Sequence, residues 1–554
     1  MSAAHGLSSP IDGKSAAQGG LAPPTASGGL PFLGHLLELR RQPIALMQRV
    51  YDECGEIGEF RLANSEIVLM TGAGPAEAFF RAPDEQLDQA AAYPFMKPIF
   101  GPGVVFDLPV EQRKQTLRTR ALQDKHMRRH AEVIARETEQ MCDRLGPSGE
   151  IDLLDFFGEL TTYTSTSTLI GPEFRDQLAP VGREFAKAFQ DLEKGTDALA
   201  YVNPYLPLPS FRRRDKARLR LVELITTILE DRKSQGMKCR DLLQVMDTVL
   251  DENGERKFSR SEITGMIIGM MLAGHHTSQG TASWALIELL RNPECSRRVV
   301  DELDDLYADG REVSHQALRE IPLLEGVIKE TLRLHPPLII LMRKVMYDFH
   351  YGDITIEAGK LAAVSPAVSN RLPEVFPDPH RFDIDRYSDE RREDAKNPWT
   401  WIPFGAGRHK CVGSAFAVMQ MKAIFSILLR RYEFEFSQPA ESYVNDHSKM
   451  VVQLKQPCRV RYQRRELSDA QLSRRPAVVA AEAEAVSQRP WHVVVDLDLC
   501  QGHAVCTGEA PEIFALGQGN QLQILVEKPG PELRRRAEKA VRYCPSQALR
   551  IVEE

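Results

Sequence analysis

The sequence of 554 residues contains no apolar run long enough to span a membrane. Its most apolar internal stretch, Gly265–Gly274, is far shorter than the ~20 residues that a spanning helix needs. The first thirty residues are rich in serine, glycine, alanine and proline, and no segment among them resembles a signal peptide or a membrane anchor. We therefore expect residues 1–29 to be disordered and the protein to be cytoplasmic, with peripheral contact at a membrane surface left open.

The sequence also lacks an excess of charge of either sign. It has 70 basic and 77 acidic residues, which gives a net charge of −7, so there is no global electrostatic argument for nucleic-acid binding. Paired cysteines are scarce too, because most of the nine cysteines occur singly. This usage favours a reducing compartment without structural disulfides.

The length exceeds that of one ordinary domain, and one large and one small domain fit it best. Composition changes over residues 464–490, which are rich in arginine, alanine, glutamate and serine and show little apolar periodicity, as is typical of a linker. We therefore predict a large domain over residues 30–463, a linker over 464–490 and a compact domain over 491–554.

Local patterns predict several elements of the large domain. Glu66–Met70 is a β-branched and apolar run suited to a strand. The prolines and glycines of Tyr93–Asp107 exclude a long helix there. The proline-rich Pro204–Pro209 interrupts a long region of helical periodicity. Ser259 and Glu262 have the spacing of a capping box at the start of a further helix.

A glycine-rich stretch of ten residues, Phe404–Gly413, reads Phe-Gly-Ala-Gly-Arg-His-Lys-Cys-Val-Gly and precedes an apolar segment. The pattern predicts a tight loop that delivers Cys411 to the start of a buried helix. Backbone N–H groups at a helix N-terminus favour a thiolate, and the glycines allow a flat cofactor to approach the backbone. A buried structural cysteine is the usual reading of a lone cysteine, but the whole pattern favours a metal ligand.

This loop resembles the haem-binding loop of the cytochrome P-450 monooxygenases. The resemblance implies a mainly α haem-thiolate fold with small β-sheets, a haem b cofactor, O2 as a reactant and Cys411 as the iron ligand. Most of that family has arginine at the position of His409. The histidine resembles the sterol 14α-demethylase branch of the family.

The helix expected after Ser259 contains the polar sequence Ala-Gly-His-His-Thr-Ser at residues 273–278. Glycine and threonine are unfavourable in mid-helix, and such a local conflict often marks a functional site. The sequence resembles the distal helix of the sterol 14α-demethylases. The resemblance implies that Thr277, with His276, delivers protons to the distal oxygen.

The resemblance assigns three further groups of residues. A buried network that braces the haem loop is implied for Glu330, Arg333 and Arg386. Partners for the haem propionates are implied at Tyr93, Lys114, Arg343 and His409. A substrate pocket is implied at Phe95, Met96, Phe100, Leu272, Ala273, Leu338 and Met450.

The last 64 residues contain Cys500, Cys506 and a Cys544-Pro545 pair, a thiolate pattern that matches ligands of an iron–sulfur cluster. Ferredoxins with four iron atoms have a further cysteine where this chain has His503. The simplest inference is a 3Fe-4S cluster on the three cysteines in a small α+β ferredoxin-like domain, with a 4Fe-4S cluster less favoured. A zinc site of three cysteines and His503 is the alternative.

Together these features resemble bacterial sterol 14α-demethylases fused to a ferredoxin. The resemblance implies three O2-dependent oxidations that remove the 14α-methyl group of a lanosterol-like sterol as formate. Electrons would come from the fused ferredoxin and from an NAD(P)H-dependent ferredoxin reductase. The alternatives are a monooxygenase that hydroxylates a terpenoid or fatty acid once, and a gas-sensing haem protein without turnover.

Overall fold

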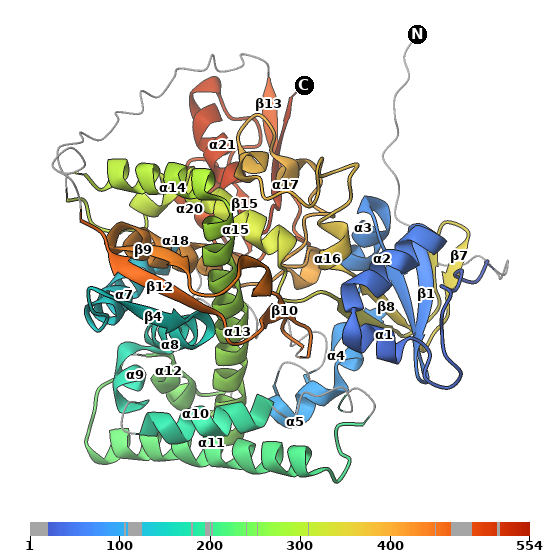
Figure 1. Ribbon diagram of the computed structural model, residues 1–554, viewed down its shortest axis with the longest axis horizontal. Helices are drawn as coiled ribbons and strands as arrows, with labels where there is room; N and C mark the ends of the chain where they lie inside the picture. The colour runs from blue at the N-terminus through green and yellow to red at the C-terminus, as the bar shows by residue number, and fades with distance from the viewer. Residues whose placement is uncertain are drawn as a thin grey trace.

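A computed structural model describes residues 20–104, 107–108, 124–178, 181–193, 200, 203–239, 241–251, 253–308, 310–448, 450–466, 490–517 and 521–553. The large domain is mainly helical, with a mixed sheet at one side (Figure 1). This arrangement confirms the predicted fold class. Among the described residues, no helix is both long and apolar enough to cross a bilayer.

The sheet at one side of the large domain has five strands in the order β1-β2-β8-β5-β3. The predicted strand at residues 66–70 is confirmed as part of β2, which pairs with β1 in antiparallel and β8 in parallel fashion. The strands are β1 (Ile57–Leu62), β2 (Ser65–Met70), β8 (Leu361–Val364), β5 (Leu341–Val345) and β3 (Leu87–Asp88). Beside them lie α1 (Leu36–Arg41), α2 (Pro43–Cys54), α3 (Ala73–Arg81) and the hairpin β6 (Phe349–Tyr351) and β7 (Ile354–Ile356).

The expectation of disorder for residues 1–29 does not hold for residues 20–29. Leu21 forms a bridge to Ile354, and the backbone N–H of Ala26 donates to the carbonyl oxygen of Glu59 over 2.8 Å. Ala26 is also buried. The segment is ordered because its backbone groups find partners at the edge of the sheet.

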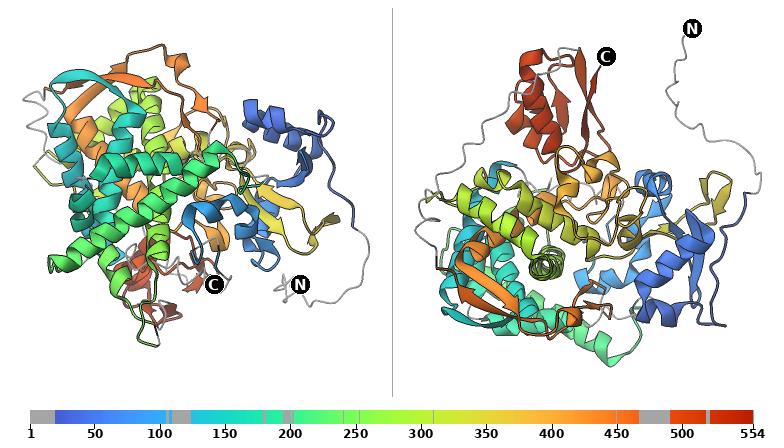
Figure 2. Two further views of the ribbon diagram at one scale, coloured as in Figure 1. Left: turned by 90° about the horizontal axis from the view of Figure 1, so that it is seen from below. Right: turned by 45° about the horizontal axis from the view of Figure 1, so that its top comes forward.

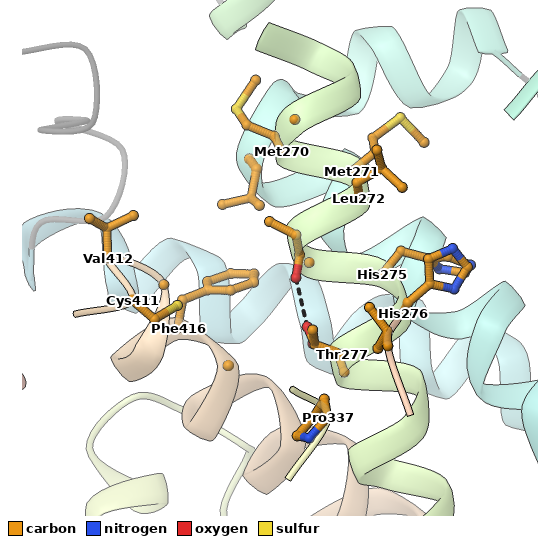
Figure 3. Close-up of a pocket in the computed structure, with 18 of the residues that line it drawn as sticks. Met270, Met271, Leu272, His275, His276, Thr277, Pro337, Cys411, Val412 and Phe416 are labelled. Atoms are coloured by element: carbon orange, nitrogen blue, oxygen red, sulfur yellow. Dashed lines mark hydrogen bonds between the residues drawn. The ribbon is translucent and has the colours of Figure 1, made fainter. Parts of the chain in front are cut away.

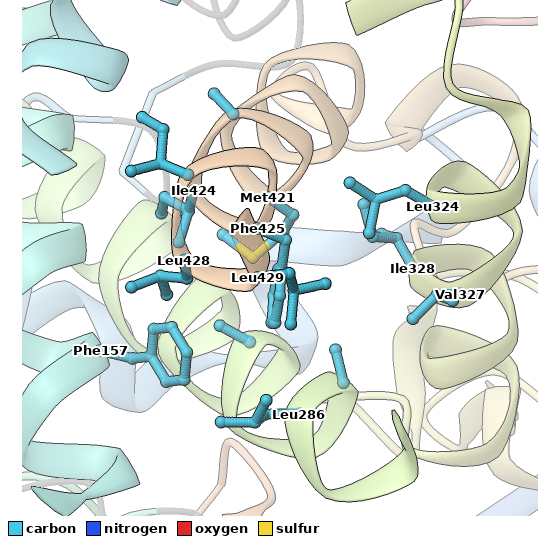
Figure 4. Packing of buried hydrophobic residues seen from close by; sticks show 14 of the residues in the cluster. Phe157, Leu286, Leu324, Val327, Ile328, Met421, Ile424, Phe425, Leu428 and Leu429 are labelled. Carbon is cyan, nitrogen blue, oxygen red and sulfur yellow. The ribbon is translucent and has the colours of Figure 1, made fainter. Parts of the chain in front are cut away.

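The centre of the helical part is α13 (Arg260–Arg291), which begins with the predicted capping box of Ser259 and Glu262. Around it pack α8 (Leu153–Ser165), α15 (Pro322–Leu334) and α18 (Ser414–Arg431). Figure 4 shows their shared core, in which Phe157, Leu286, Ile328 and Phe425 come from the four helices in turn. Apolar burial from all sides fixes α13, which therefore holds its cavity-facing residues in a rigid frame.

The other helices surround this core. At one end of α13, α10 and α11 cross it as a separate layer (Figure 1). The predicted break at Pro204–Pro209 is confirmed, because α11 begins at Pro209. The helices are α7 (Asp124–Asp143), α9 (Pro172–Leu178), α10 (Gly182–Glu193), α11 (Pro209–Ser234), α12 (Leu242–Thr248), α14 (Pro293–Leu306), α16 (Pro366–Ser369) and α17 (Glu393–Lys396).

Residues 93–104 form only short turns, as their prolines and glycines predict. They follow α4 (Gln89–Ala92) and comprise the 3-10 turn η1 (Pro94–Met96) and α5 (Lys97–Phe100). A second sheet of three strands has the order β4 (Ser148–Asp152), β12 (Arg459–Arg464) and β9 (Tyr432–Phe436). Beside it, β10 (Asn445–Asp446) pairs with β11 (Gln453–Leu454).

The C-terminal residues form a small α+β body that stands on one end of the large domain (Figure 2). Its outer strands β13 (Trp491–Val495) and β16 (Leu549–Glu553) pair in antiparallel fashion. Its other elements are α20 (Val505–Glu509), β14 (Phe514–Leu516), β15 (Leu522–Ile524) and α21 (Arg534–Arg542). Before it, the large domain continues beyond β12, because Arg465 still pairs with Asp304 over 2.7 Å.

Candidate active site and cluster site

A cavity of about 2310 Å³ lies between α13 and the loop that precedes α18 (Figure 3). Six of the seven predicted pocket residues line it, namely Met96, Phe100, Leu272, Ala273, Leu338 and Met450. Phe95 does not line it. Its side chain is fully buried beside Phe211 and Ala200 and packs against the cavity-lining Met96 and Met450.

The loop with Cys411 owes its shape to two glycines. Gly405 and Gly407 have φ values of +64° and +62°, a region that disfavours residues with a Cβ atom. A Cβ atom on Gly407 would clash with the carbonyl oxygen of Phe80, so the loop packs directly on the backbone of the last turn of α3. The N–H of Cys411 donates to the carbonyl oxygen of Phe404 over 2.8 Å, which holds the cysteine at the cavity wall.

The Cys411 side chain is exposed at the cavity wall. Desolvation by the surrounding protein raises the pKa of its thiol, and the Gly413 N–H and the charge of Lys410 lower it. Coordination to a metal ion would remove the proton.

Across the cavity, α13 presents Thr277 toward Cys411, whereas the rings of His275 and His276 point away from it (Figure 3). The Thr277 hydroxyl donates to the carbonyl oxygen of Ala273 over 2.6 Å. The Nδ1 atom of His276 lies 3.3 Å from Oε1 of Gln279. The structure thus brings Thr277 to the Cys411 side of the helix and places the His276 ring on another side.

A polar network lies behind the two histidines. The side-chain amide of Gln453 donates to the His276 carbonyl oxygen and to Oε1 of Gln279, each over 3.0 Å. The Nδ1 atom of His275 lies 3.1 Å from the Thr162 hydroxyl oxygen. Burial, with a smaller effect of His276, lowers the pKa of His275 to about 3. His275 is therefore neutral at physiological pH.

One edge of the cavity carries a buried cation. Arg343 donates to the carbonyl oxygen of Phe79 over 2.7 Å, and burial lowers its pKa to about 10, with Asp84 opposing. The Tyr93 hydroxyl accepts a hydrogen bond from the Met342 N–H over 2.9 Å. His409 forms an ion pair with the buried Asp84.

Three of the four predicted propionate partners, Tyr93, Arg343 and His409, thus border this edge. Lys114 lies outside the described residues.

The structure brings Glu330, Arg333 and Arg386 together in a fully buried network. Arg333 binds Glu330 in bidentate fashion, with both distances 2.8 Å, and Nε of Arg386 lies 3.2 Å from the same carboxylate. Arg333 also donates to the carbonyl oxygen of Asn370 over 3.1 Å. The Asn370 side chain accepts from the N–H of Ile402 over 3.0 Å, two residues before the Cys411 loop begins. The network is therefore linked to the start of that loop.

In the C-terminal body, Cys500, Cys506 and Cys544 belong to one core. Burial, with the neighbouring thiols of Cys544 and Cys500, raises the pKa of Cys506 to about 12. Within the described residues, no three His, Cys, Asp or Glu side chains are grouped closely enough for a single metal ion. A cluster remains compatible, since its cysteines bind different iron atoms and need wider spacing.

Comparison with known proteins identifies the large domain. The family model for cytochrome P-450 matches residues 23–462. The chain belongs to the cytochrome P-450 family. A second family model, described as a 4Fe-4S single cluster domain, matches residues 493–551. The P-450 match covers the cavity and the Cys411 loop, and the second match covers all three C-terminal cysteines.

Relatives within the P-450 family are similar over nearly their whole length. A protein named sterol 14α-demethylase from Mycobacterium tuberculosis strain H37Rv is 59% identical over 448 residues, which are 80% of this chain and 99% of the relative. Lanosterol 14-alpha demethylase from Bos taurus is 32% identical, over 81% of this chain and 91% of the relative. The chain therefore belongs to the same family as these demethylases.

Among solved structures, the retinoic acid-bound cyanobacterial CYP120A1 matches with a TM-score of 0.70 at 21% identity. The match covers 81% of this chain and 100% of that one. This structural similarity supports the P-450 fold of the large domain.

The residues of the cavity fit the haem that the P-450 family implies. Cys411 offers a thiol on one wall, and α13 contributes the small residues Ala273 and Gly274 to the lining. The lowered pKa of Arg343 shows that its charge is poorly balanced, which suits an anionic carboxylate from the cofactor. In the C-terminal domain, three neighbouring cysteines suit an iron–sulfur cluster.

Sequence reasoning missed several residues around this site. Asp84, the partner of His409, stands in no recognisable motif, and Gln279 and Gln453 come from segments that gave only helix and strand patterns. Their role depends on contacts between distant segments. No signal in the single sequence could have found them.

Proposed function

We propose that the protein is a sterol 14α-demethylase that receives electrons from its own C-terminal iron–sulfur domain. Three successive O2-dependent oxidations remove the 14α-methyl group of a lanosterol-like sterol as formate. The observation that carries this proposal is the 59% identity over 99% of the length of relatives named for the same reaction. The cavity of about 2310 Å³ would have to hold both the haem and the sterol.

The cavity wall has the character that a sterol requires. Met96, Phe100, Leu272, Ala273, Leu338 and Met450 form an apolar lining for a rigid, nearly flat hydrocarbon. Two of them are methionines, whose flexible side chains adapt to a bulky ring system. We propose that these six residues bind the substrate and that Phe95 supports the wall from behind.

A haem held by Cys411 would supply the activation of O2, which the side chains alone cannot provide. Cys411 would bind the iron as a thiolate and donate electron density to it. Because the Thr277 hydroxyl gives its hydrogen to Ala273, its oxygen faces the cavity as an acceptor. Thr277 would hold a proton donor at Oγ1, and His276 with Gln279 would connect that position to the polar network behind α13.

The remaining side chains would hold the cofactor. Arg343, His409 and Tyr93, together with Lys114, would bind the two carboxylates. Glu330, Arg333 and Arg386 would brace the loop through Asn370 and Ile402. Their part is structural, because the network lies in the core and does not border the cavity.

For the C-terminal domain we propose a 3Fe-4S cluster on Cys500, Cys506 and Cys544. His503 stands where a fourth thiolate ligand would be needed, and Nε2 of its ring lies 3.1 Å from the Gln501 side-chain oxygen. An NAD(P)H-dependent ferredoxin reductase would reduce the cluster, in the cytoplasm. The ferredoxin domain is proposed at 491–554. The haem domain extends beyond the expected 30–463 at both ends, because residues 20–29 pair with its sheet and Arg465 pairs with Asp304, so the linker begins after Arg465 and not at 464.

Product analysis tests the function. The purified chain, incubated with lanosterol, O2, a ferredoxin reductase and NAD(P)H, should yield formate and a sterol without the 14α-methyl group, detected by mass spectrometry. Cys411→Ser should abolish this product and the carbon-monoxide band of thiolate ligation. Cys458→Ser, which changes a cysteine buried in the core, should retain both.

Two results would contradict the proposal. A single hydroxylated product from a terpenoid or fatty acid, without formate from lanosterol, would favour another monooxygenase. Ligand binding without any product in a single turnover would favour a haem sensor.

A further inference from the structure

Residues 408–411 all border the cavity, and two of them also contact the C-terminal domain. His409 pairs with Asp84 of the large domain. Arg408 and the carbonyl oxygen of Lys410 meet the C-terminal domain. Nη2 of Arg408 lies 3.4 Å from the Asp498 carboxylate. The loop is therefore the boundary between the two domains.

At this boundary the side-chain amide of Gln501 donates to the carbonyl oxygen of Lys410 over 2.6 Å. Gln501 follows Cys500, and Lys410 precedes Cys411, so one hydrogen bond joins neighbours of two proposed metal ligands. Lys410, Cys411, Cys500 and Gln501 all border the same cavity, so proposed ligands of both domains lie near this contact.

Ion pairs surround this contact. Arg81 lies 3.0 Å from Asp496, and Arg542 lies 3.2 Å from Asp389. The pair that is least exposed joins Arg319 to Glu509. The guanidinium of Arg319 also lies 4.9 Å from the centre of the Tyr543 ring, next to Cys544.

The signs of these pairs define one orientation. Arg81, Arg319 and Arg408 place positive charge on the large domain, opposite carboxylates of the small domain. The pair of Arg542 and Asp389 has the reverse polarity. A domain rotated on this surface would bring Arg542 toward other arginines, and such like-charge contacts are unfavourable.

We propose that this surface is a docking site that accepts the chain's own ferredoxin domain in one orientation, and that Gln501 couples the cluster to the haem through the Lys410 carbonyl. The reversed pair of Arg542 and Asp389 sets the orientation. The proposal rests on the proposed function, since it assumes that electrons pass between the domains. Each transfer moves one electron from the cluster side to the Cys411 side, and the reductase, oxidising a nicotinamide nucleotide, replaces it.

Charge exchange in the full chain tests the docking. Arg319→Glu places two carboxylates together and should favour the undocked state by about tenfold or more, the equivalent of ~1.4 kcal/mol. Small-angle X-ray scattering should then give a larger radius of gyration than for the parent. Arg319→Glu combined with Glu509→Arg should restore the compact form. For the second ion pair, Arg542→Asp alone should likewise increase the radius of gyration, and Arg542→Asp combined with Asp389→Arg should restore it.

Two controls accompany the scattering. Arg220→Glu removes an ion pair with Glu184 at the opposite end of the molecule, on α11 and α10, and should leave the radius unchanged. The parent should expand between ~0.05 M and ~1 M salt, because salt screens exposed ion pairs. Equal radii for the parent and for Arg319→Glu, or failure of the double variants to restore the parent radius, would overturn the docking site.

Gln501→Glu tests the coupling. It keeps an oxygen for His503 but removes the donor to the Lys410 carbonyl. The haem should be reduced several-fold more slowly in a stopped-flow experiment under carbon monoxide, while the electron paramagnetic resonance signal of the cluster stays unchanged. An unchanged rate would refute the role of Gln501. Scattering and reduction do not depend on sterol turnover, so a failed demethylation assay with positive results here would reject only the proposed function.

Discussion

His409 and Asp84 form an ion pair at the edge of the cavity, with the carboxylate buried in the loop after α3. The pair fixes the imidazole at the place where we propose a cofactor carboxylate. Asp84→Asn removes the charge and should weaken haem retention by roughly tenfold, because a hydrogen bond to a charged group contributes about 1.5–3 kcal/mol. Haem retention is measured as the rate at which haem transfers from the protein to apomyoglobin. Glu85→Gln, at the exposed neighbouring position, should leave it unchanged, and equal rates for both variants would contradict the role of Asp84.

Glu330→Gln should destabilise the large domain by about 3–5 kcal/mol, because Arg333 and Arg386 would keep buried charges without their shared carboxylate. Urea unfolding followed by the Soret band measures the loss. The matched control is Glu320→Gln, which removes an exposed pair with Arg311 and should cost less than ~1 kcal/mol. Similar decreases in the free energy of unfolding for both variants would show that the buried network contributes no more to stability than an exposed ion pair.

Thr277→Ala should leave sterol binding nearly unchanged while turnover falls by about 10²-fold and peroxide formation rises, because proton delivery is lost. Spectral titration and the ratio of peroxide to oxidised nucleotide measure these effects. Thr264→Ala is the control, since Thr264 makes the same hydrogen bond to a carbonyl four residues earlier on α13. Unchanged coupling in Thr277→Ala would refute the role in proton delivery.

The two loop glycines make a matched pair of variants. Gly405→Ala adds strain in the left-handed region, about 1–2 kcal/mol, but its Cβ atom would meet only ordinary contacts at 3.7 Å. Gly407→Ala adds the same strain and a clash with the Phe80 carbonyl oxygen. Gly407→Ala should therefore lose most of its bound haem, measured as the haem-to-protein ratio, whereas Gly405→Ala should keep more. The reverse order would exclude packing on Phe80 as the cause.

His275 should make the protein sensitive to acid. Its pKa is about 3 in the folded state, against ~6.5 when unfolded, so the unfolded state binds more protons between these values. Stability should then decrease as pH falls below ~6.5, by up to ~1.4 kcal/mol per pH unit. His275→Gln should reduce this slope, measured by urea unfolding from pH 7 to about pH 5. His350→Gln, at an exposed site, should not, and parallel curves for His275→Gln and the parent would contradict the prediction.

The sequence was informative where chemistry depends on neighbours along the chain. The Cys411 loop, the capping box of α13 and the polar residues around Thr277 could all be recognised because their residues lie within one turn or loop. The packing of Phe95 could not, since its burial beside Phe211 and Ala200 depends on contacts between distant segments. The desolvation that raises the pKa of Cys411 likewise comes from the surrounding fold, which no local pattern contains.

Contacts between residues far apart in the chain could likewise not be predicted from the sequence. Asp84 and His409 are separated by more than half of the chain, and the contact of Gln501 with Lys410 joins two domains. Such pairs arise from packing between elements, and each partner alone resembles an ordinary surface residue. Residues 20–29 were misjudged for a similar reason, because their polar composition hides the backbone pairing with β1 and β7.

The pairing of two adjacent loop residues with different domains has a consequence for inheritance. Arg408 pairs with Asp498 in the other domain, whereas its neighbour His409 pairs with Asp84 in the same domain. Because both domains are encoded in one reading frame, a change at position 408 and its compensation at position 498 are inherited together. In related chains with the same fusion, a charge reversal at position 408 should therefore occur together with a charge reversal at position 498. A change at position 409 should instead accompany a change at position 84.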